Sequence, residues 1–219
     1  MIRKILFSVA NAYKNLKADY RCGDSVDVIR NRFLSSIKKE LGKCAFKCDF
    51  LLGKDTLNID GVTEGAFPKS KDTLLIDISV RHEGVWCDVC RTFFFGTPDE
   101  KQRKDYQMIV RSIKEGEKVL KAGVRAREVY RAVNEVYKHS GHTLIHHAGH
   151  KIGSRALLQP QFLEDKCKKV GLGEYFTIES GLYDGCGIRL ENDYLITESG
   201  AENLFEDIMP LNIEEYVLQ

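Results

Sequence analysis

The sequence predicts an α+β protein in which two helices precede a β-hairpin and the same order then repeats. Apolar residues recur at helical spacing in four segments, two pairs of β-rich segments are each joined by a glycine-containing turn, and no low-complexity linker separates them. The repeated order suggests two related halves. We expect one domain over residues 1–219, a length that a single large core accommodates.

The first half is predicted to open with two amphipathic helices. Residues 1–18 carry apolar side chains on one side and lysines on the other. Residues 26–41 repeat apolar side chains at spacings of three and four, and Gly42 ends that helix. Residues 44–70 hold short apolar pieces broken by glycine and proline, which is typical of one or two short strands with loops.

Hairpins are predicted in both halves. Residues 73–80 and 85–95 are rich in β-branched and aromatic side chains and flank a turn at Glu83-Gly84. Residues 175–182 and 188–197 form the second such pair.

The helices of the second half lie between the two hairpins. A capping residue followed by a proline at the first helical position, Thr97-Pro98, begins a helix that runs to about Leu120. Residues 125–139 are predicted to form the other helix.

The composition excludes several classes of protein. With 33 basic and 32 acidic side chains the formal net charge is +1, so no global field attracts nucleic acid or anionic lipid. No apolar run approaches the roughly 20 residues of a membrane span. The cysteines are odd in number and scattered, which is not the pattern of a disulfide framework. We therefore expect a soluble cytoplasmic protein with no nucleic-acid or membrane partner.

Asp77 interrupts an apolar strand, where an unpaired charge would carry a desolvation penalty of several kcal/mol. An exposed edge strand would avoid this penalty, and Asp77 by itself leaves that alternative open. Asp88 favours a buried site, because a turn near His82-Glu83 makes it the cross-strand partner of Asp77, with Cβ atoms roughly 4.5 to 5.5 Å apart. A register shift of one residue would instead turn one acid to the other face.

The same construction recurs in the second hairpin. Glu179 and Glu191 flank a turn centred on Gly185 and are expected to face each other. If the two hairpins pack side by side, they bring four carboxylates together. Such a cluster is typical of a site that holds two divalent cations about 3.5 to 4 Å apart.

Histidine supplies a further type of metal ligand. Five of the six histidines lie within residues 139–150, and His146, His147 and His150 lie within five positions of one another. Single histidines are common on protein surfaces. The concentration here, beside Gly149 and Gly153, favours metal binding by at least one of them.

These motifs together resemble the methionine aminopeptidase, prolidase and creatinase superfamily. Its catalytic domain has the pita-bread fold, a curved antiparallel sheet flanked by helices in pseudo-twofold halves. The resemblance covers about residues 5–205. The matching motifs are Asp77 with Asp88 eleven residues on, Arg91-Thr92-Phe93, Gly149-His150 with Gly153, Glu179-Ser180-Gly181, and Arg189-Leu190-Glu191.

The resemblance implies two divalent metal ions and a set of five ligands. Asp77 would chelate one metal, Asp88 and Glu191 would bridge both, and His150 and Glu179 would complete the second. One imidazole with four carboxylates suits Mn²⁺, Fe²⁺, Co²⁺ or Zn²⁺. The implied chemistry is hydrolysis by a metal-bridging hydroxide, with Glu179 as the catalytic residue that takes up and passes on the proton.

The chain departs from the family pattern at two positions. Family peptidases carry a histidine seven residues after the metal-binding one, where this chain has Leu157, and another some 17 or 18 residues before the first metal Asp, where it has Ile59-Asp60. Loss of one such donor typically lowers rates about 10² to 10³-fold. His146 and Arg189 match the Xaa-Pro aminopeptidase and prolidase branch, in which they are expected to bind substrate.

We therefore expect a dinuclear-metal hydrolase, a peptidase that acts on an N-terminal or Xaa-Pro bond. Its partner would be a peptide or small amide substrate, and the resemblance is compatible with a homodimer. Two alternatives are a divergent member that binds peptides or proteins with weak or no cleavage, and an enzyme that acts on a non-peptide amide. The opening helices match the catalytic half, so we expect the N-terminal domain of many relatives to be absent. Cys87 and Cys90 should point to opposite faces of a strand, so we expect no redox or zinc role for them.

Overall fold

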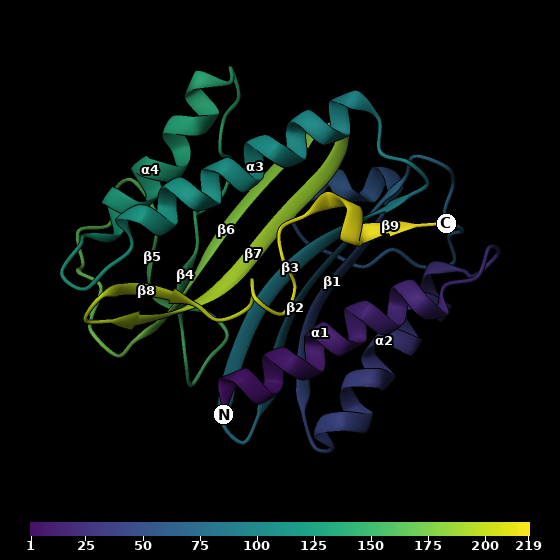
Figure 1. Ribbon diagram of the computed structural model, residues 1–219, viewed down its shortest axis with the longest axis horizontal. Helices are drawn as coiled ribbons and strands as arrows, with labels where there is room; N and C mark the ends of the chain where they lie inside the picture. The colour runs from purple at the N-terminus through teal and green to yellow at the C-terminus, as the bar shows by residue number, and fades with distance from the viewer.

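The structure is a computed structural model that describes all of residues 1–219. One nine-stranded sheet carries four α-helices and two short 3₁₀ helices (Figure 1). In chain order the elements are α1 Ile2–Asp19, α2 Val26–Leu41, β1 Ala45–Leu52, η1 Gly53–Leu57, β2 Thr73–His82, β3 Val85–Phe95, α3 Glu100–Val119, α4 Ala126–His139, β4 His150–Ile152, β5 Leu158–Gln161, β6 Tyr175–Asp184, β7 Cys186–Thr197, β8 Gly200–Asn203, η2 Ile213–Tyr216 and β9 Val217–Leu218. The predicted helices and hairpins are confirmed, with boundaries that differ by a few residues at most.

The sheet joins the two hairpins into one surface. Its strand order is β1-β2-β3-β7-β6-β4-β5, with β8 paired to β7 and β9 to β3. The hairpins β2–β3 and β6–β7 meet where Cys90 lies opposite Glu191. The prediction that they pack side by side is therefore confirmed.

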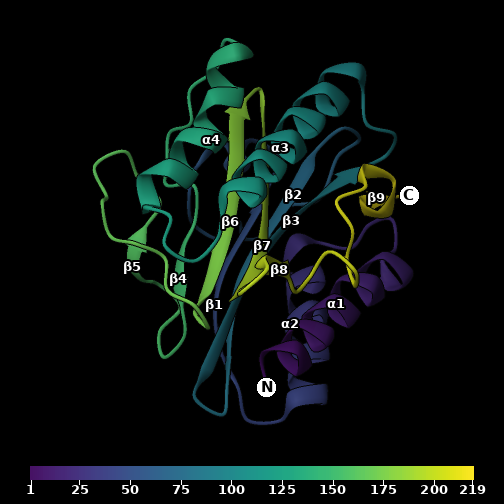
Figure 2. The same ribbon diagram turned by 60° about the vertical axis from the view of Figure 1, so that its left-hand side comes forward.

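Both helix pairs cover the same face of this sheet. Tyr13 of α1 donates a hydrogen bond to the carbonyl oxygen of Ile76, and Gly116 of α3 lies against Ile178. Side chains alternate along a strand, so Asp77 and Glu179, which adjoin these two isoleucines, point to the opposite, helix-free face. In Figures 1 and 2, α1 and α2 lie over the half of the sheet that contains β2 and β3, and α3 lies over β6 and β7.

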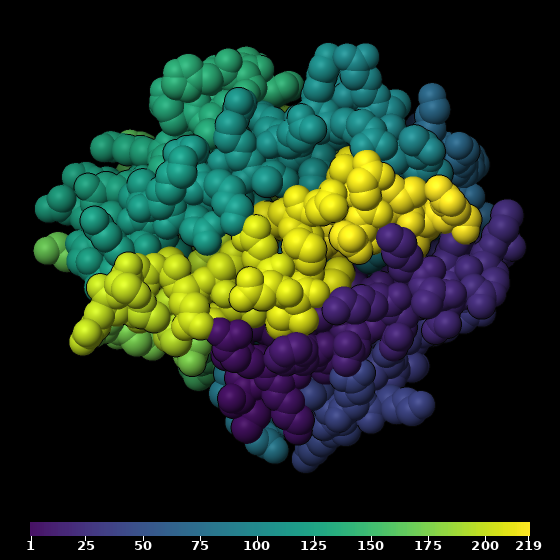
Figure 3. Space-filling model, viewed as in Figure 1, coloured from purple at the N-terminus to yellow at the C-terminus, as the bar shows by residue number.

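The hydrophobic core lies between the helices and the sheet. One cluster of 51 buried residues draws on all four helices, so the two halves share a continuous core. The helix-free face has only a small apolar cluster of Leu51, Leu75 and Cys90. Figure 3 shows the C-terminal segment along the seam between α1 and α3. No helix combines the length and apolar character needed to cross a bilayer.

The helix starts follow ordinary capping chemistry, with one correction. The Ser25 side chain accepts a hydrogen bond from the backbone N–H of Val28 at the start of α2. Helix α3 begins after Asp99, whose side chain forms a reciprocal capping box with Gln102. The prediction that Pro98 is the first helical residue is therefore wrong. Asp99 is the N-cap residue, its carboxylate accepts a hydrogen bond from the backbone N–H of Gln102, and the helix begins at Glu100.

The register of the first hairpin also corrects the sequence analysis. The turn is a two-residue turn in which Glu83 (φ 49°) and Gly84 (φ 85°) both have positive φ, so that Asp77 pairs with Cys90 and Ser79 pairs with Asp88. Asp77 and Asp88 do not face each other directly. The shift is two residues, which keeps both acids on the same face because side chains alternate with a period of two.

The second hairpin has the expected register, with Glu179 opposite Glu191. The predicted orientation of the Cys-x-x-Cys pair is also confirmed, because Cys87 belongs to the core cluster under the helices and Cys90 to the cluster on the other face. All seven cysteines are free thiols.

Arg91 anchors the C-terminal segment to the junction of the hairpins. This fully buried side chain donates hydrogen bonds to the carbonyl oxygens of Cys90 (2.8 Å), Glu191 (2.8 Å) and Met209 (2.7 Å) and to the Tyr216 hydroxyl (2.9 Å). It thereby holds β3 and β7 together next to the acids of the other face.

Candidate metal centre

A cavity of about 420 Å³ opens on the helix-free face of the sheet. Strands β1, β2, β3, β4, β6 and β7, the segment after η1 and the segments before β4 and β5 contribute its lining. All the residues predicted from the sequence as site residues line this one cavity: Asp77, Asp88, His146, His150, Glu179, Arg189 and Glu191.

Three of these side chains, Asp88, His150 and Glu191, bring their ligand atoms within 4.8 Å of one another. His150 Nε2 lies 3.5 Å from Asp88 Oδ2 and 3.7 Å from Glu191 Oε1. His150 Nδ1 lies 3.2 Å from the carbonyl oxygen of Lys151, a bond that requires Nδ1 to donate, so the neutral ring has a bare Nε2. Burial lowers the pKa of His150 to about 4, which keeps the ring neutral near pH 7.

The geometry of this triad fits a cation. Two ligands about 2.0 to 2.1 Å from one ion at a tetrahedral angle lie about 3.4 Å apart, close to the separations of His150 from Asp88 and Glu191. The Glu191 Oε1 atom is buried and has no hydrogen-bond partner. A bound divalent ion would satisfy both this oxygen and the bare Nε2 of His150. The residues present therefore fit the metal that the resemblance implies.

The buried acids of the triad are electrostatically destabilised without an ion. Burial raises the pKa of Asp88 well above its usual range, and the neighbouring Asp77 raises it further. Burial likewise raises the pKa of Glu191, with Asp88 as its most strongly interacting acidic neighbour. Such groups favour either protons or a metal ion in their midst.

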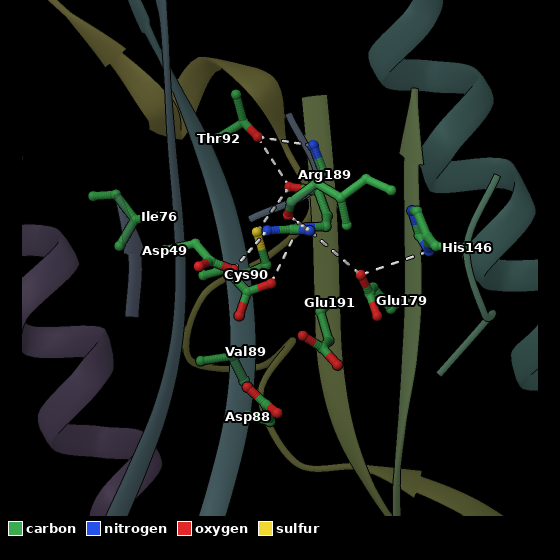
Figure 4. A network of polar contacts seen from close by, with 12 residues as sticks. Asp49, Ile76, Asp88, Val89, Cys90, Thr92, His146, Glu179, Arg189 and Glu191 are labelled. Atoms are coloured by element: carbon green, nitrogen blue, oxygen red, sulfur yellow. Dashed lines mark hydrogen bonds and ion pairs between the residues drawn. The ribbon is translucent and has the colours of Figure 1, made fainter. Parts of the chain in front are cut away.

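Asp77 is held by an arginine rather than by the triad. Arg189 is 2% exposed, and its Nε lies 3.1 Å from Asp77 Oδ2 while its Nη2 lies 3.4 Å from Asp49 Oδ2. Its Nη1 donates to the carbonyl oxygen of Ile59 (2.7 Å). Figure 4 shows the guanidinium group reaching between Asp49 and Glu179. These contacts link Arg189 to the acids of the site, and a substrate contact by Arg189 stays a prediction.

Glu179 lies among imidazoles. Its Oε1 is 3.6 Å from His146 Nδ1 and its Oε2 is 3.2 Å from His147 Nδ1. Burial raises the pKa of Glu179, but His146, His147 and Arg189 together outweigh burial and hold it below its usual range. One ligand atom each from His146, His147 and Glu179 lies within 4.8 Å of the others, as in the triad. The five predicted ligands thus share a cavity, in which Asp88, His150 and Glu191 form one group, Glu179 belongs to a second, and Asp77 pairs with Arg189.

His147 and Asp49 are cavity residues that the sequence analysis did not single out. His147 is one of three histidines close together in the sequence, but this clustering does not indicate which of the three rings point into the cavity. Asp49 pairs with Asp77 across β1 and β2, a contact that depends on the register of a strand whose pattern was weak.

A close backbone approach positions His150 and Glu179. Gly149 has a φ of 123°, and a Cβ atom there would lie 2.2 Å from the carbonyl oxygen of Thr177. The absent side chain lets the backbone N–H of His150 donate to Thr177 Oγ1 (3.1 Å) and that of Glu179 donate to the Ala148 carbonyl oxygen (3.2 Å). Only glycine combines this conformation with this proximity.

The two departures from the family pattern also lie at the cavity. Leu157 and Ile59 are both part of its lining and are 45% and 44% exposed, respectively. The structure therefore places apolar side chains, which donate no hydrogen bonds, in two walls of the site.

Comparisons with known proteins agree with this fold. The model of metallopeptidase family M24 matches residues 7–198. An uncharacterized peptidase of Methanocaldococcus jannaschii is 34% identical over 155 residues, which are 68% of this chain and 43% of that protein. The Xaa-Pro dipeptidase of Pyrococcus furiosus is 31% identical over 137 residues, which are 61% of this chain and 39% of that protein.

Solved structures with the same fold include two Xaa-Pro peptidases. X-Pro aminopeptidase from Thermotoga maritima matches 99% of this chain and 62% of its own with a TM-score of 0.89 at 23% identity. Prolidase from Pyrococcus furiosus matches 93% of this chain and 63% of its own with a TM-score of 0.86 at 25% identity.

These matches define the fold and the family. The chain spans less than half the length of the two curated relatives described above. Its structural neighbours confirm the α+β pita-bread fold and the similarity to the prolidase and Xaa-Pro aminopeptidase branch. The protein belongs to metallopeptidase family M24.

Proposed function

We propose that this chain is a dinuclear-metal-dependent hydrolase, a peptidase of the Xaa-Pro or aminopeptidase type whose catalytic domain is residues 1–219. The observation that carries the proposal is the convergence of Asp88, His150 and Glu191, whose ligand atoms lie within 4.8 Å of one another. The family relationship and the printed activities of relatives, Xaa-Pro dipeptidase and X-Pro aminopeptidase, support the substrate class.

The metal centre would hold two divalent ions, of Mn, Co, Fe or Zn. When bound, such ions supply a Lewis acid and a water that is nucleophilic at neutral pH. Their ligands would be Asp77, Asp88, His150, Glu179 and Glu191.

The charge of the cavity supports two ions rather than one. Apart from the exposed Asp60 and Lys47, five carboxylates and one permanently charged cationic side chain, Arg189, line it. The excess of four negative charges equals the charge of two divalent cations. One ion would leave two buried negative charges uncompensated, which costs several kcal/mol.

Two residues of the chain would handle the proton and the substrate. Glu179, whose pKa is held low, is ionised at neutral pH and can take up the proton of the attacking water and pass it to the leaving amine. His146 Nδ1 donates to the His147 carbonyl oxygen (2.7 Å), and its Nε2 is buried without a partner. That unpaired atom supports a contact of His146 with a peptide.

Metal loading followed by a substrate survey tests the proposal. The purified chain would be loaded in turn with Mn²⁺, Co²⁺, Fe²⁺ and Zn²⁺ and assayed on a library of Xaa-Pro dipeptides, longer peptides and non-peptide amides. We expect about two equivalents of metal and cleavage of at least one peptide class. Asp88→Asn should lower the metal content and abolish cleavage, whereas Asp165→Asn, at an exposed position away from the cavity, should change neither. No cleavage of any compound with any metal would refute the proposal.

A second candidate function is peptide binding without cleavage. The apolar walls formed by Leu157 and Ile59 favour it, because they remove donors that a hydrolase needs and leave surface that binds side chains. Elemental analysis separates the two functions. Less than one equivalent of metal after loading, with retained peptide binding, would support the second.

A further inference from the structure

His147 lies beside the triad and remains accessible from the cavity. Its ring centroid is 5.3 Å from that of His150, with the two planes at 84°, and its side chain is 21% exposed. It follows His146 directly and belongs to the segment that leads into β4. A group at this position can contact both the substrate and the reacting atoms that the triad would hold.

The backbone defines which nitrogen of His147 carries the proton. The N–H of Gly149 donates to His147 Nδ1 at 3.3 Å, and a nitrogen that accepts a hydrogen bond carries no proton. The neutral ring therefore has its proton on Nε2, which has no partner within the protein and is not among the buried unpaired atoms. Glu179 Oε2 lies 3.2 Å from the same Nδ1, an ion pair when the ring is protonated.

The other donors of the cavity are either charged or already committed. Arg189 is a cation that forms ion pairs with Asp77 and Asp49 and donates a hydrogen bond to the Ile59 carbonyl oxygen. The Nδ1 atoms of His146 and His150 donate hydrogen bonds to main-chain carbonyl oxygens, and the Ser79 hydroxyl donates one to Asp88 (2.8 Å). Lys47 is an exposed residue on strand β1 whose ammonium lies over the Trp86 ring. His147 Nε2 is thus the uncommitted neutral N–H of the cavity.

We propose that His147 donates a hydrogen bond from Nε2 to the substrate carbonyl oxygen and is a catalytic residue of this site. The inference rests on the proposed hydrolase function. Water attacks the carbonyl carbon and gives its proton to Glu179, while the C=O electron pair moves onto the oxygen that His147 contacts. The C–N bond then breaks, and Glu179 returns the proton to the amine. Leu157 and Ile59 cannot supply the donor that this oxyanion requires.

Substitution of His147 in the metal-loaded chain tests the role. We expect His147→Ala to lower kcat by about 10² to 10³-fold with little change in KM, because the bond strengthens as charge develops on the oxygen. His147→Gln keeps an N–H donor and should restore at least about tenfold of the loss. His142→Ala, a change of another loop histidine outside the cavity, should behave as the wild type.

Two further readouts separate a donor from a ligand. Metal content and the visible spectrum of the Co²⁺-loaded protein should be the same in wild type and His147→Ala. A loss of metal or a changed spectrum would overturn the proposal, because His147 would then bind the ion. Unchanged kcat in His147→Ala would overturn it as well.

A transition-state mimic tests the donor separately from peptide cleavage. A phosphinic Ala-Pro pseudodipeptide carries a tetrahedral, anionic centre, and His147→Ala should weaken its binding by about 10² to 10³-fold, while binding of free proline changes far less. If the wild type cleaves nothing but shows this His147-dependent affinity, the proposed function fails and the donor role stands. Equal affinity of the mimic for both proteins would overturn the donor role.

Discussion

Gly149→Ala tests whether the close approach of β4 to β6 builds the metal centre. The new Cβ atom would lie 2.2 Å from the Thr177 carbonyl oxygen, and contacts below 3.0 Å are essentially never observed. The backbone at this point must therefore move by ~0.8 Å or more. Because His150 is the next residue, its imidazole moves with the backbone relative to Asp88 and Glu191.

The expected magnitude follows from two contributions. A φ of 123° costs a non-glycine residue about 1 to 3 kcal/mol, and the overlap adds about 1 to 3 kcal/mol. We expect the free energy of unfolding to fall by about 2 to 6 kcal/mol. A displacement of about 1 Å at a site of this kind typically costs about 10²-fold, so the affinity for Mn²⁺ should weaken by that order.

Calorimetric Mn²⁺ titration and urea unfolding of the metal-free protein measure the two effects. The matched control is Gly123→Ala, at a position with a φ of 85° where an added Cβ meets nothing within 4 Å. It should lose stability through backbone strain alone and keep the wild-type metal affinity. The reasoning is refuted if Gly149→Ala binds Mn²⁺ as tightly as Gly123→Ala does.

Two further predictions concern protons and the buried arginine. Burial raises the pKa of Asp77 in the metal-free protein to about 7, so below that pH an ion must displace a proton. Displacement of the Asp77 proton alone lowers the apparent Mn²⁺ affinity by up to about tenfold per pH unit below pH 7, and the raised pKa values of Asp88 and Glu191 make the fall steeper. Titrations in buffers of differing ionisation heat should show proton release, and a constant affinity between pH 6 and 8 would contradict this. Arg91→Leu leaves the carbonyl oxygens of Cys90, Glu191 and Met209 without their donor, so urea unfolding should show a loss of at least about 3 kcal/mol, and a loss under about 1 kcal/mol would count against the role of Arg91.

The first hairpin shows what the residue pattern of a strand specifies and what the turn adds. An acid in an apolar strand indicates which residues of the strand lie on the same face of the sheet as the acid, and Asp77 and Asp88 do lie on the same face. The pattern has a period of two, so it cannot distinguish registers that differ by two residues. The Glu83-Gly84 turn decided the register, and it made Ser79 rather than Asp77 the partner of Asp88.

The second hairpin was predictable in more detail, because Gly185 marks the turn and the register that places Glu179 opposite Glu191 follows from it. The contacts of those acids were not predictable. Arg189 reaches Asp77 only because the sheet continues from β3 to β7, and a pairing between strands about a hundred residues apart in the chain leaves no local signal.

By itself, the sequence determined the α+β class, the positions of the helices and hairpins, and the residues that could hold metal, since periodicity and charges in apolar strands are local properties. The tertiary structure alone decided that Asp88, His150 and Glu191 converge on one space, that Arg189 is committed to acids, and that His147 keeps a free N–H. These are consequences of how distant strands pair and how closely their backbones approach. Distances of this kind are properties of the packed sheet rather than of any segment.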